Sequence, residues 1–297
     1  MILSIDGSFA LHRARFVVAS KGVPTRDDII ALFMNMLIKL FQQFPTSHVY
    51  IYFDRERSRH RLKLYPEYKG QRKEDAGDLS LVAYNLARDF LVKNLPDLGI
   101  TTILEDGIEA DDFGYLVAHT YDSGIHVTDD RDWFGSLFPG WSLFRPKANE
   151  YITYTQFCEM VAHHENPRMI YLIARAITGD KSDNIPGIKK VKWEDALILA
   201  PRILLSQPLG EEQYAKRVLD KMDQVRYNIS IMTPMWVLRS EEARTAFVLA
   251  EGKRERDLSS PLLLWKRFYE QLSHLAQKDM MRLSFEYNSI AKRFLPL

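Results

Sequence analysis

Short apolar runs, spaced along the first two-thirds of the 297-residue chain, are the feature that most constrains its fold. Each run has the length of a buried strand and is bounded by polar or turn-forming residues. The runs that we predict to be strands are Ile2–Ile5, Val49–Phe53, Thr101–Leu104, Gly124–Thr128 and Ser142–Phe144. The helical patterns between the first four include Asp27–Phe44, Ser80–Asn94 and Ala110–Tyr121. This alternation predicts an α/β fold, with a mostly parallel central sheet and helices on both faces.

The strand patterns fade after about Gly187, and helical patterns follow. The helices predicted there are Trp193–Leu205, Glu211–Asn228, Ser240–Leu249 and Pro261–Leu283. We therefore expect an α/β core over residues 1–184 and a helical region, packed on that core, over residues 185–297.

The composition is that of a globular protein, and its charged residues nearly cancel to a net charge of +1. A basic surface for nucleic acid must therefore be local. Cys158 is the single cysteine, which excludes an intrachain disulfide and argues against a zinc site built from cysteines. No basic region precedes an apolar stretch at the start, and no segment runs uncharged for the ~20 residues of a membrane span. We expect a cytoplasmic protein with no membrane partner.

Acidic residues come just after the predicted strands. Asp6 follows the first strand and Asp54 follows the second. The acidic residues beyond the third and fourth strands are Glu109, Asp111, Asp112, Asp130 and Asp132. Asp180 and Asp183 are three residues apart, so on a helical turn they would share one face. Because the carboxyl ends of parallel strands meet at one edge of a sheet, we expect these carboxylates to converge there.

Such a cluster would repel itself strongly, because each carboxylate raises the pKa of its neighbours. It therefore needs cations. Oxygen ligands without nearby histidine or cysteine favour Mg²⁺, with Mn²⁺ as a substitute, over zinc. Two ions ~3.5–4 Å apart are the usual arrangement for phosphoryl hydrolysis. Any one of these residues could instead cap a helix or complement its dipole, but capping preference alone does not explain their repeated placement after strands.

A basic stretch between Asp54 and Ser80 differs from the rest of the chain. Its basic residues are Arg55, Arg57, Arg59, His60, Arg61, Lys63, Lys69, Arg72 and Lys73. Tyr65 and Tyr68 interrupt them, and we expect Tyr65 to pack rather than stack on a base. Cations and rings in alternation suit a channel for single-stranded nucleic acid, but a solvated basic loop would look similar. Both interpretations stay open on composition alone.

Six motifs, in this chain order, resemble those of the 5′-nuclease family. They are Ile2–Gly7, Phe53–Asp54, Tyr65–Arg72, Glu109–Asp112, Thr128–Asp132 and Gly179–Gly187. That family includes flap endonucleases, the 5′-nuclease domain of bacterial DNA polymerase I and bacteriophage 5′ to 3′ exonucleases. The length of the chain is most similar to the bacteriophage members. The resemblance covers roughly residues 1–200.

The resemblance implies that the carboxylates surround two metal ions. The residues around the first ion would be Asp6, Asp54, Glu109 and Asp111. The residues around the second would be Asp130, Asp132, Asp180 and Asp183, some of them through water. Asp112 would lie between the two ions. Asp111 and Asp132 would then be catalytic carboxylates.

The resemblance also implies a helical arch over the active site, at about residues 55–95. Lys69 and Arg72 would be catalytic, pointing from the base of the arch toward the scissile phosphate. Tyr68 would offer its ring for stacking an unpaired base. All three residues would thus bind DNA.

A helix-hairpin-helix element follows the acidic motifs in the family, and its glycine-rich turn approaches a duplex phosphate. Here Lys189, Lys190 and Lys192 stand at the corresponding positions. We expect a helix-hairpin-helix-like element in which these lysines bind DNA by direct charge pairing, and we do not carry over the family's monovalent cation.

The expected function is that of a structure-specific 5′-nuclease. It would act as flap endonuclease and 5′ to 3′ exonuclease on DNA phosphodiesters in replication or repair, through a two-metal-ion mechanism. Its partner would be branched, flapped or 5′-ended DNA, or an RNA–DNA hybrid, and we expect a monomer in the cytoplasm, or in the host cytoplasm for a bacteriophage protein. Two alternatives stay open: RNase H-like removal of RNA primers by the same site, and a catalytically weak protein that binds branched DNA. Residues 55–95 and 180–192 argue against a PIN-type ribonuclease, since those proteins are much shorter and lack both segments. A phosphatase of small metabolites would leave the basic stretch without a role.

Overall fold

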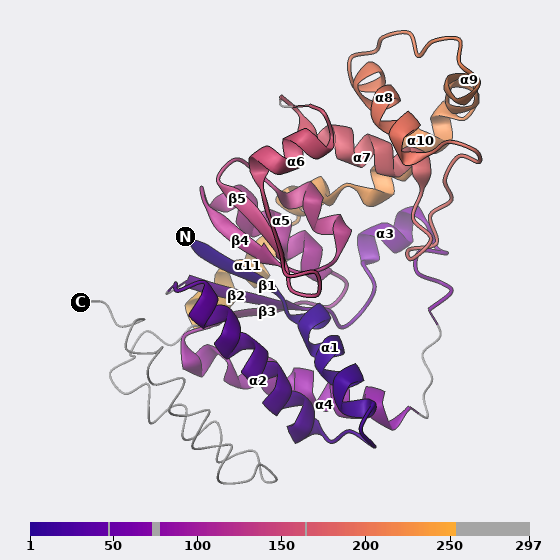
Figure 1. Ribbon diagram of the computed structural model, residues 1–297. Helices are drawn as coiled ribbons and strands as arrows, with labels where there is room; N and C mark the ends of the chain where they lie inside the picture. The colour runs from indigo at the N-terminus through magenta and orange to yellow at the C-terminus, as the bar shows by residue number, and fades with distance from the viewer. Residues whose placement is uncertain (47, 73–77, 164, 254–297) are drawn as a thin grey trace.

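The computed structural model describes residues 1–46, 48–72, 78–163 and 165–253. In this part of the chain six strands form one sheet in the order β3-β2-β1-β4-β5-β6 (Figure 1). All neighbouring strands are parallel except β6, which pairs antiparallel with β5. The strands are β1 (Ile2–Asp6), β2 (His48–Phe53), β3 (Thr101–Leu104), β4 (Gly124–Val127), β5 (Trp141–Arg145) and β6 (Glu150–Thr153). The predicted mostly parallel sheet is confirmed, and β6 is an addition to it.

Strand β1 lies at the point where the order of the strands reverses. The chain runs from β1 through β2 to β3 on one side, then returns to place β4 on the other side of β1. Asp6 ends β1 and pairs in register with Tyr52, two residues before Asp54. The crevice beyond the carboxyl ends of the strands at such a reversal is where open α/β sheets bind their ligands.

Alternate side chains of the strands feed two hydrophobic cores, one on each face of the sheet. Leu3 and Ile5 point into the first core, which is covered by α1 (Gly7–Ala19), α2 (Arg26–Gln43) and α4 (Leu79–Asn94). Tyr50 and Tyr52 point into the second core, which is covered by α5 (Ala110–Thr120), α6 (Tyr154–Met160) and α7 (Pro167–Thr178). Figure 1 shows these two groups of helices on opposite sides of the strands, which confirms the prediction.

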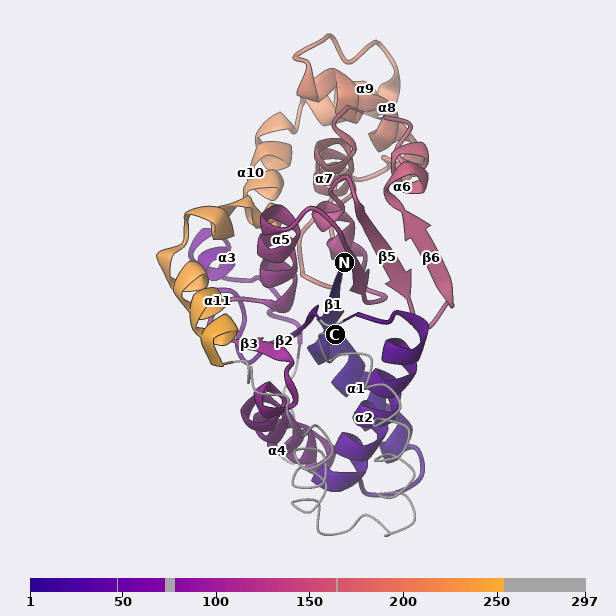
Figure 2. The same cartoon turned by 90° about the vertical axis from the view of Figure 1, so that its left-hand side faces the viewer.

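Most of the remaining helices extend the second face, but Leu98, after α4, packs into the first core. They are α3 (Arg59–Leu64), α8 (Trp193–Leu204), α9 (Gln213–Leu219), α10 (Met222–Met232), α11 (Glu241–Lys253) and the 3₁₀ helices η1 (Pro96–Leu98), η2 (Arg131–Ser136) and η3 (Pro234–Arg239). Figure 2 shows α8 and α9 at one end of the molecule and α11 beside β3. None of the helices that the structure describes is long and apolar enough to cross a membrane.

The single helix expected over Glu211–Asn228 is wrong: the backbone N–H of Lys221 donates to Val218 at 3.1 Å, and this tight turn separates α9 from α10. The helix expected over Pro261–Leu283 lies outside the described residues.

Helix α1, directly after β1, was not anticipated. It begins at Gly7, where a Cβ would lie 2.6 Å from the carbonyl oxygen of Tyr52, so α1 needs glycine to start this close to β2.

The stretch expected to form an arch, residues 55–95, is described except for residues 73–77. Helix α3 packs against α10, and α4 packs against α1 and α2. Both helices therefore contribute to the body of the protein. The arch itself remains a prediction.

A buried polar network crosses the sheet below its carboxyl edge. Ser4 on β1 donates to the hydroxyl of Tyr52 on β2 at 3.1 Å, and Nδ1 of His126 on β4 lies 2.9 Å from the Ser4 hydroxyl. The other ring nitrogen lies 3.3 Å from the carbonyl of Ser136. Burial lowers the pKa of His126 to about 3, so the ring is neutral in the folded protein.

We predict that this histidine makes the protein less stable in acid. Above pH 6.5 His126 is neutral in both states, but below it the unfolded chain binds a proton that the folded chain refuses. Between pH 7 and pH 5 the free energy of unfolding should therefore fall by about 2 kcal/mol more in the wild type than in His126→Gln. Denaturant unfolding at both pH values measures this. Exposed His119→Gln is the control, and parallel curves for wild type and His126→Gln would contradict the prediction.

Candidate metal-binding active site

The ends of β1 and β2 supply two carboxylates, of which Asp6 is buried and Asp54 is partly buried. Asp6 accepts hydrogen bonds from the backbone of Phe9, at 2.8 Å, and from the hydroxyl of Thr128 after β4, at 2.9 Å. Asp54 accepts one from the backbone of Ala110, at 2.6 Å, which fixes the start of α5 beside β2. Burial raises both pKa values, with a further contribution from neighbouring carboxylates, and that of Asp54 reaches about 6. Both residues therefore lie at the predicted edge.

A first group of carboxylates stands at the start of α5, where Glu109, Asp111 and Asp112 bring oxygens within 4.8 Å of one another. The guanidinium of Arg61, from α3, lies among them. It donates to both oxygens of Asp112, at 2.7 and 2.8 Å, and to Glu109 at 2.9 Å. Asp112 is fully buried and belongs to this group, and its expected place between two ions remains a prediction.

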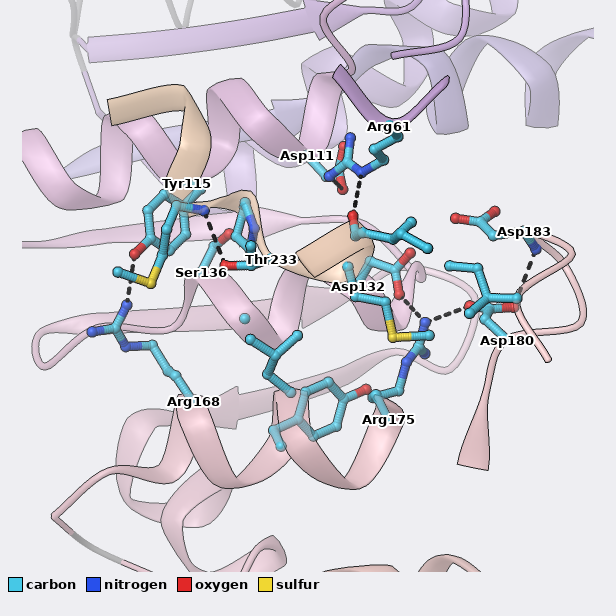
Figure 3. Close-up of a pocket in the computed structure, with 18 of the residues that line it drawn as sticks. Arg61, Asp111, Tyr115, Asp132, Ser136, Arg168, Arg175, Asp180, Asp183 and Thr233 are labelled. Atoms are coloured by element: carbon cyan, nitrogen blue, oxygen red, sulfur yellow. Dashed lines mark hydrogen bonds and ion pairs between the residues drawn. The ribbon is translucent and has the colours of Figure 1, made fainter. Parts of the chain in front are cut away.

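A second group consists of Asp132 from η2 and of Asp180 and Asp183 after α7, again with oxygens within 4.8 Å. Arg175 of α7 pairs with both Asp132 and Asp180, as Figure 3 shows. We expected a helical turn at Asp180 and Asp183, but the turn is not helical. It is closed by paired backbone hydrogen bonds between Asp180 and Ile185, at 2.7 and 2.8 Å.

Electrostatic coupling joins the two groups into one site. Asp130 accepts a hydrogen bond from the backbone of Asp132 at 3.0 Å and lies close enough to Asp6 for its charge to raise the pKa of that residue. Burial raises the pKa of Asp132 well above its ordinary value, and the charges of Asp130, Asp183 and Asp111 raise it further. The structure thus brings together the carboxylates that the sequence placed after separate strands.

The predicted stacking role of Tyr68 is wrong for this structure. Its ring is 2% exposed and packs with Ile185 and Ile231, so no base can reach its face. Its hydroxyl lies 2.8 Å from Glu109 and 3.0 Å from Asp183 and so bridges the two groups of carboxylates. Tyr65, expected to pack, is partly buried in the same cluster.

Lys69 and Arg72 both contact the carboxylates, and their catalytic roles remain predictions. The Lys69 ammonium donates to Glu109 at 2.8 Å and lies 3.9 Å from Asp183, to which Arg72 donates at 3.1 Å. Burial disfavours the charge of Lys69, but Glu109 and Asp183 outweigh it and raise its pKa. Lys69 and Arg61 together lower the pKa of Glu109 to about 2 despite its burial. These charges therefore persist at neutral pH.

The three hairpin lysines lie apart from the carboxylates, in the turn between α7 and α8. Lys189, Lys190 and Lys192 are all exposed to solvent. Lys190 has a φ of 61°, the left-handed conformation that glycine adopts most easily. The lysine thus keeps the backbone shape of a glycine turn and adds a cation. DNA contact by these residues remains a prediction.

Arg61 and Arg175 are the functional residues that sequence reasoning missed. Arg61 was one of nine basic residues in the basic stretch, and nothing marked it as buried. Arg175 lies on the apolar helix α7, five residues before Asp180. A cation in an apolar helix close to an acidic motif was a signal that could have identified it.

The carboxylates fit divalent metal ions by the chemistry of the donor set. They are hard oxygen donors, and neither of the two groups includes a histidine or cysteine. Burial and mutual repulsion raise the pKa values of Asp6, Asp54 and Asp132, because both disfavour the charged carboxylates. Bound cations would stabilise these charges.

Comparison with known proteins agrees with this geometry. Residues 1–162 match the family of the 5′-3′ exonuclease, N-terminal resolvase-like domain, and the chain belongs to this family. The resemblance noted from the motifs is confirmed.

Among curated relatives, DNA polymerase I of Mycobacterium bovis is 28% identical over 239 residues, covering 76% of this chain and 24% of the polymerase. The chain therefore spans about a quarter of the length of that relative. The 5′-3′ exonuclease of Bacillus subtilis is 29% identical over 204 residues, covering 64% of this chain and 66% of the exonuclease. The fold is similar to that of the bacteriophage T5 flap endonuclease, with a TM-score of 0.62 and 17% identity over 98% of this chain and 99% of that one.

We predict that Tyr68→Phe destabilises the protein by about 1–3 kcal/mol, because Glu109 and Asp183 lose a buried hydrogen-bond donor. Chemical denaturation in the presence of a chelator measures this effect without metal. Tyr151→Phe, at a tyrosine that is 44% exposed, should change little. Unchanged stability of Tyr68→Phe would contradict the bridging role of its hydroxyl.

Proposed function

We propose that this protein is a structure-specific 5′-nuclease, with flap endonuclease and 5′ to 3′ exonuclease activity on DNA. One observation carries the proposal. One electrostatic site gathers carboxylates from the ends of β1, β2 and β4, from the start of α5, and from the turn that holds Asp180 and Asp183. Lys69 and Arg72 lie against this site. Such a site can hold metal ions and a phosphodiester together.

The residues divide naturally between two ions, for which we propose Mg²⁺ with Mn²⁺ as a substitute. Asp6, Asp54, Glu109 and Asp111 would hold the first ion. Asp130, Asp132, Asp180 and Asp183 would hold the second. When bound, the ions would activate water and stabilise the leaving oxygen of an in-line displacement.

Lys69 and Arg72 would neutralise the charge that builds up on the scissile phosphate. Both are already positioned by the acidic site, since Lys69 donates to Glu109 and Arg72 to Asp183. The backbone N–H of Lys69 also donates to the carbonyl of Asp183, at 3.0 Å. Arg72 keeps 55% of its side chain exposed, so it can turn toward a phosphate that enters from solvent.

The substrate class follows from relatives and from charge. The T5 flap endonuclease structure is described as a complex with DNA and metal ions, which supports branched or 5′-ended DNA as the substrate here. Lys189, Lys190 and Lys192 would hold the duplex part by pairing with phosphates. An RNA–DNA hybrid is the second substrate to test.

The decisive experiment uses a 5′-flapped duplex labelled at both ends, with Mg²⁺ and then with chelator. We predict cleavage near the branch that stops when the metal is removed. Asp132→Asn and Asp183→Asn should abolish most cleavage and leave DNA binding largely intact, because each removes an oxygen ligand. A second substrate with an RNA strand distinguishes primer removal from DNA cleavage.

The control is Asp223→Asn, since the side chain of Asp223 is 99% exposed on α10 and remote from the carboxylates. It should cleave as the wild type does. Near-normal turnover in both Asp132→Asn and Asp183→Asn would remove these residues from the active site. Tight binding of the flapped duplex without any cleavage would favour a catalytically weak binding protein.

We further predict that duplex binding weakens steeply as salt rises, since each phosphate that a lysine neutralises releases counterions. Lys190→Ala combined with Lys192→Ala should reduce the slope of log affinity against log salt by up to about 2, roughly one for each lysine replaced. Binding titrations at several salt concentrations measure the slope. Lys253→Ala, on α11, is a control of equal charge type. A slope that stays unchanged in the double variant would show that these lysines do not meet phosphate.

A further inference from the structure

Arg61 is the one member of the basic stretch, among its described residues, that is buried among the acidic residues of the candidate site. Its side chain is 3% exposed, and its guanidinium is surrounded by Glu109, Asp111 and Asp112. A guanidinium in that position cannot meet a DNA phosphate. Its role must therefore be sought in what it does to the three carboxylates.

The hydrogen bonds of Arg61 treat the three carboxylates differently. Both oxygens of Asp112 are taken, at 2.7 and 2.8 Å, in a bidentate pair. Glu109 gives up only Oε2, at 2.9 Å, and Asp111 has a long contact of 3.5 Å through one oxygen. Asp112 is thus fully engaged by Arg61. Glu109 keeps Oε1, to which Lys69 donates at 2.8 Å, and Asp111 keeps one oxygen that Arg61 does not bind.

The opposite side of Arg61 is fixed as well. Its Nε donates to the carbonyl of Ile231 on α10, at 3.3 Å, and its backbone N–H donates to the hydroxyl of Ser58 at 3.3 Å. Ser58 in turn donates its backbone N–H to Glu109, at 3.4 Å. The guanidinium is therefore held in one orientation by groups outside the acidic site, and it can impose that orientation on the carboxylates.

We propose that Arg61 is a positioning residue, which orients Glu109 and Asp111 toward a divalent ion and keeps Asp112 out of the set of metal ligands. The inference rests on the proposed function, because it concerns the same carboxylates. It goes further in assigning Asp112 as the counter-ion of Arg61. Groups that orient metal ligands in this way typically change metal affinity or activity by roughly 10–100-fold when they are removed.

The charge of Arg61, taken alone, predicts the opposite change in metal affinity. A guanidinium beside a cation site repels the cation, so its removal would tighten metal binding if Arg61 acted only through its charge. The double variant Arg61→Gln with Asp112→Asn removes one positive and one negative charge together. Its net charge equals that of the wild type, so a loss of metal affinity in this variant cannot be attributed to net charge.

The test compares Arg61→Gln, Arg61→Lys and the double variant by three measurements. Mn²⁺ binding without DNA is followed by calorimetry, unfolding is followed in chelator, and single-turnover cleavage of a flapped duplex is followed as a function of Mg²⁺. The matched control is Arg26→Gln with Asp27→Asn, a remote ion pair of 2.7 Å at the start of α2.

We expect Arg61→Gln to melt at a lower temperature, because Asp112 is left buried and unpaired, and the double variant to recover much of that loss. The double variant should nevertheless bind Mn²⁺ at least about tenfold more weakly than the wild type and cleave correspondingly slowly. Arg61→Lys should also bind Mn²⁺ weakly, because an ammonium cannot reproduce the planar fork. The control pair should bind Mn²⁺ as the wild type does.

Wild-type Mn²⁺ affinity in the double variant would overturn the inference, and so would tighter binding in Arg61→Gln. In either case cleavage by the wild type would leave the proposed function standing. A wild-type protein that neither binds Mn²⁺ nor cleaves would overturn the proposed function, and the inference with it.

Discussion

Repulsion among buried carboxylates is the constraint on which the rest of this structure depends. The parallel strands deliver acidic residues to one edge, and burial raises the pKa of Asp6, Asp54 and Asp132 because it disfavours their charged forms. Such a site destabilises the folded chain, and the destabilisation grows with each added carboxylate. The fold offsets it with cations drawn from elements outside the sheet: Arg61 comes from α3 and Arg175 from α7. Those elements are therefore part of the active site, although neither is a strand end.

Contacts between distant segments hold these cations in place. The segment that carries Tyr68 and Lys69 lies along the turn that carries Asp183, more than a hundred residues later in the chain. Gln71 donates to the carbonyls of Lys181 and Ser182, at 2.8 and 2.9 Å. The buried ring of Tyr68 packs in the same place, so apolar burial and hydrogen bonds act together. The basic stretch thus packs against the turn that carries Asp183, and it also supplies cations to the site.

The sequence predicted those parts of the molecule that depend on local order. Apolar runs identify strands, and an acidic residue after a parallel strand must lie at the carboxyl edge, so Asp6 and Asp54 could be placed without coordinates. The pairing of Arg61 with Asp112 could not be predicted, because 51 residues separate them and the sequence does not distinguish a buried arginine from an exposed one. The predicted stacking role of Tyr68 was wrong for a related reason. Alternating rings and cations show that a segment is amphipathic but not which side of it faces the protein.

The balance of charge supports the proposed pair of ions rather than a single ion. Among the described residues, nine carboxylates meet four cations at this site, namely Arg61, Lys69, Arg72 and Arg175. Five negative charges are left over when all nine carboxylates are ionised. A single divalent ion would leave three of them to repel an approaching phosphate, whereas two would leave one. Because Arg72 is mostly exposed and can leave Asp183 for the substrate, the site with two ions can accept a phosphodiester without a large repulsive barrier.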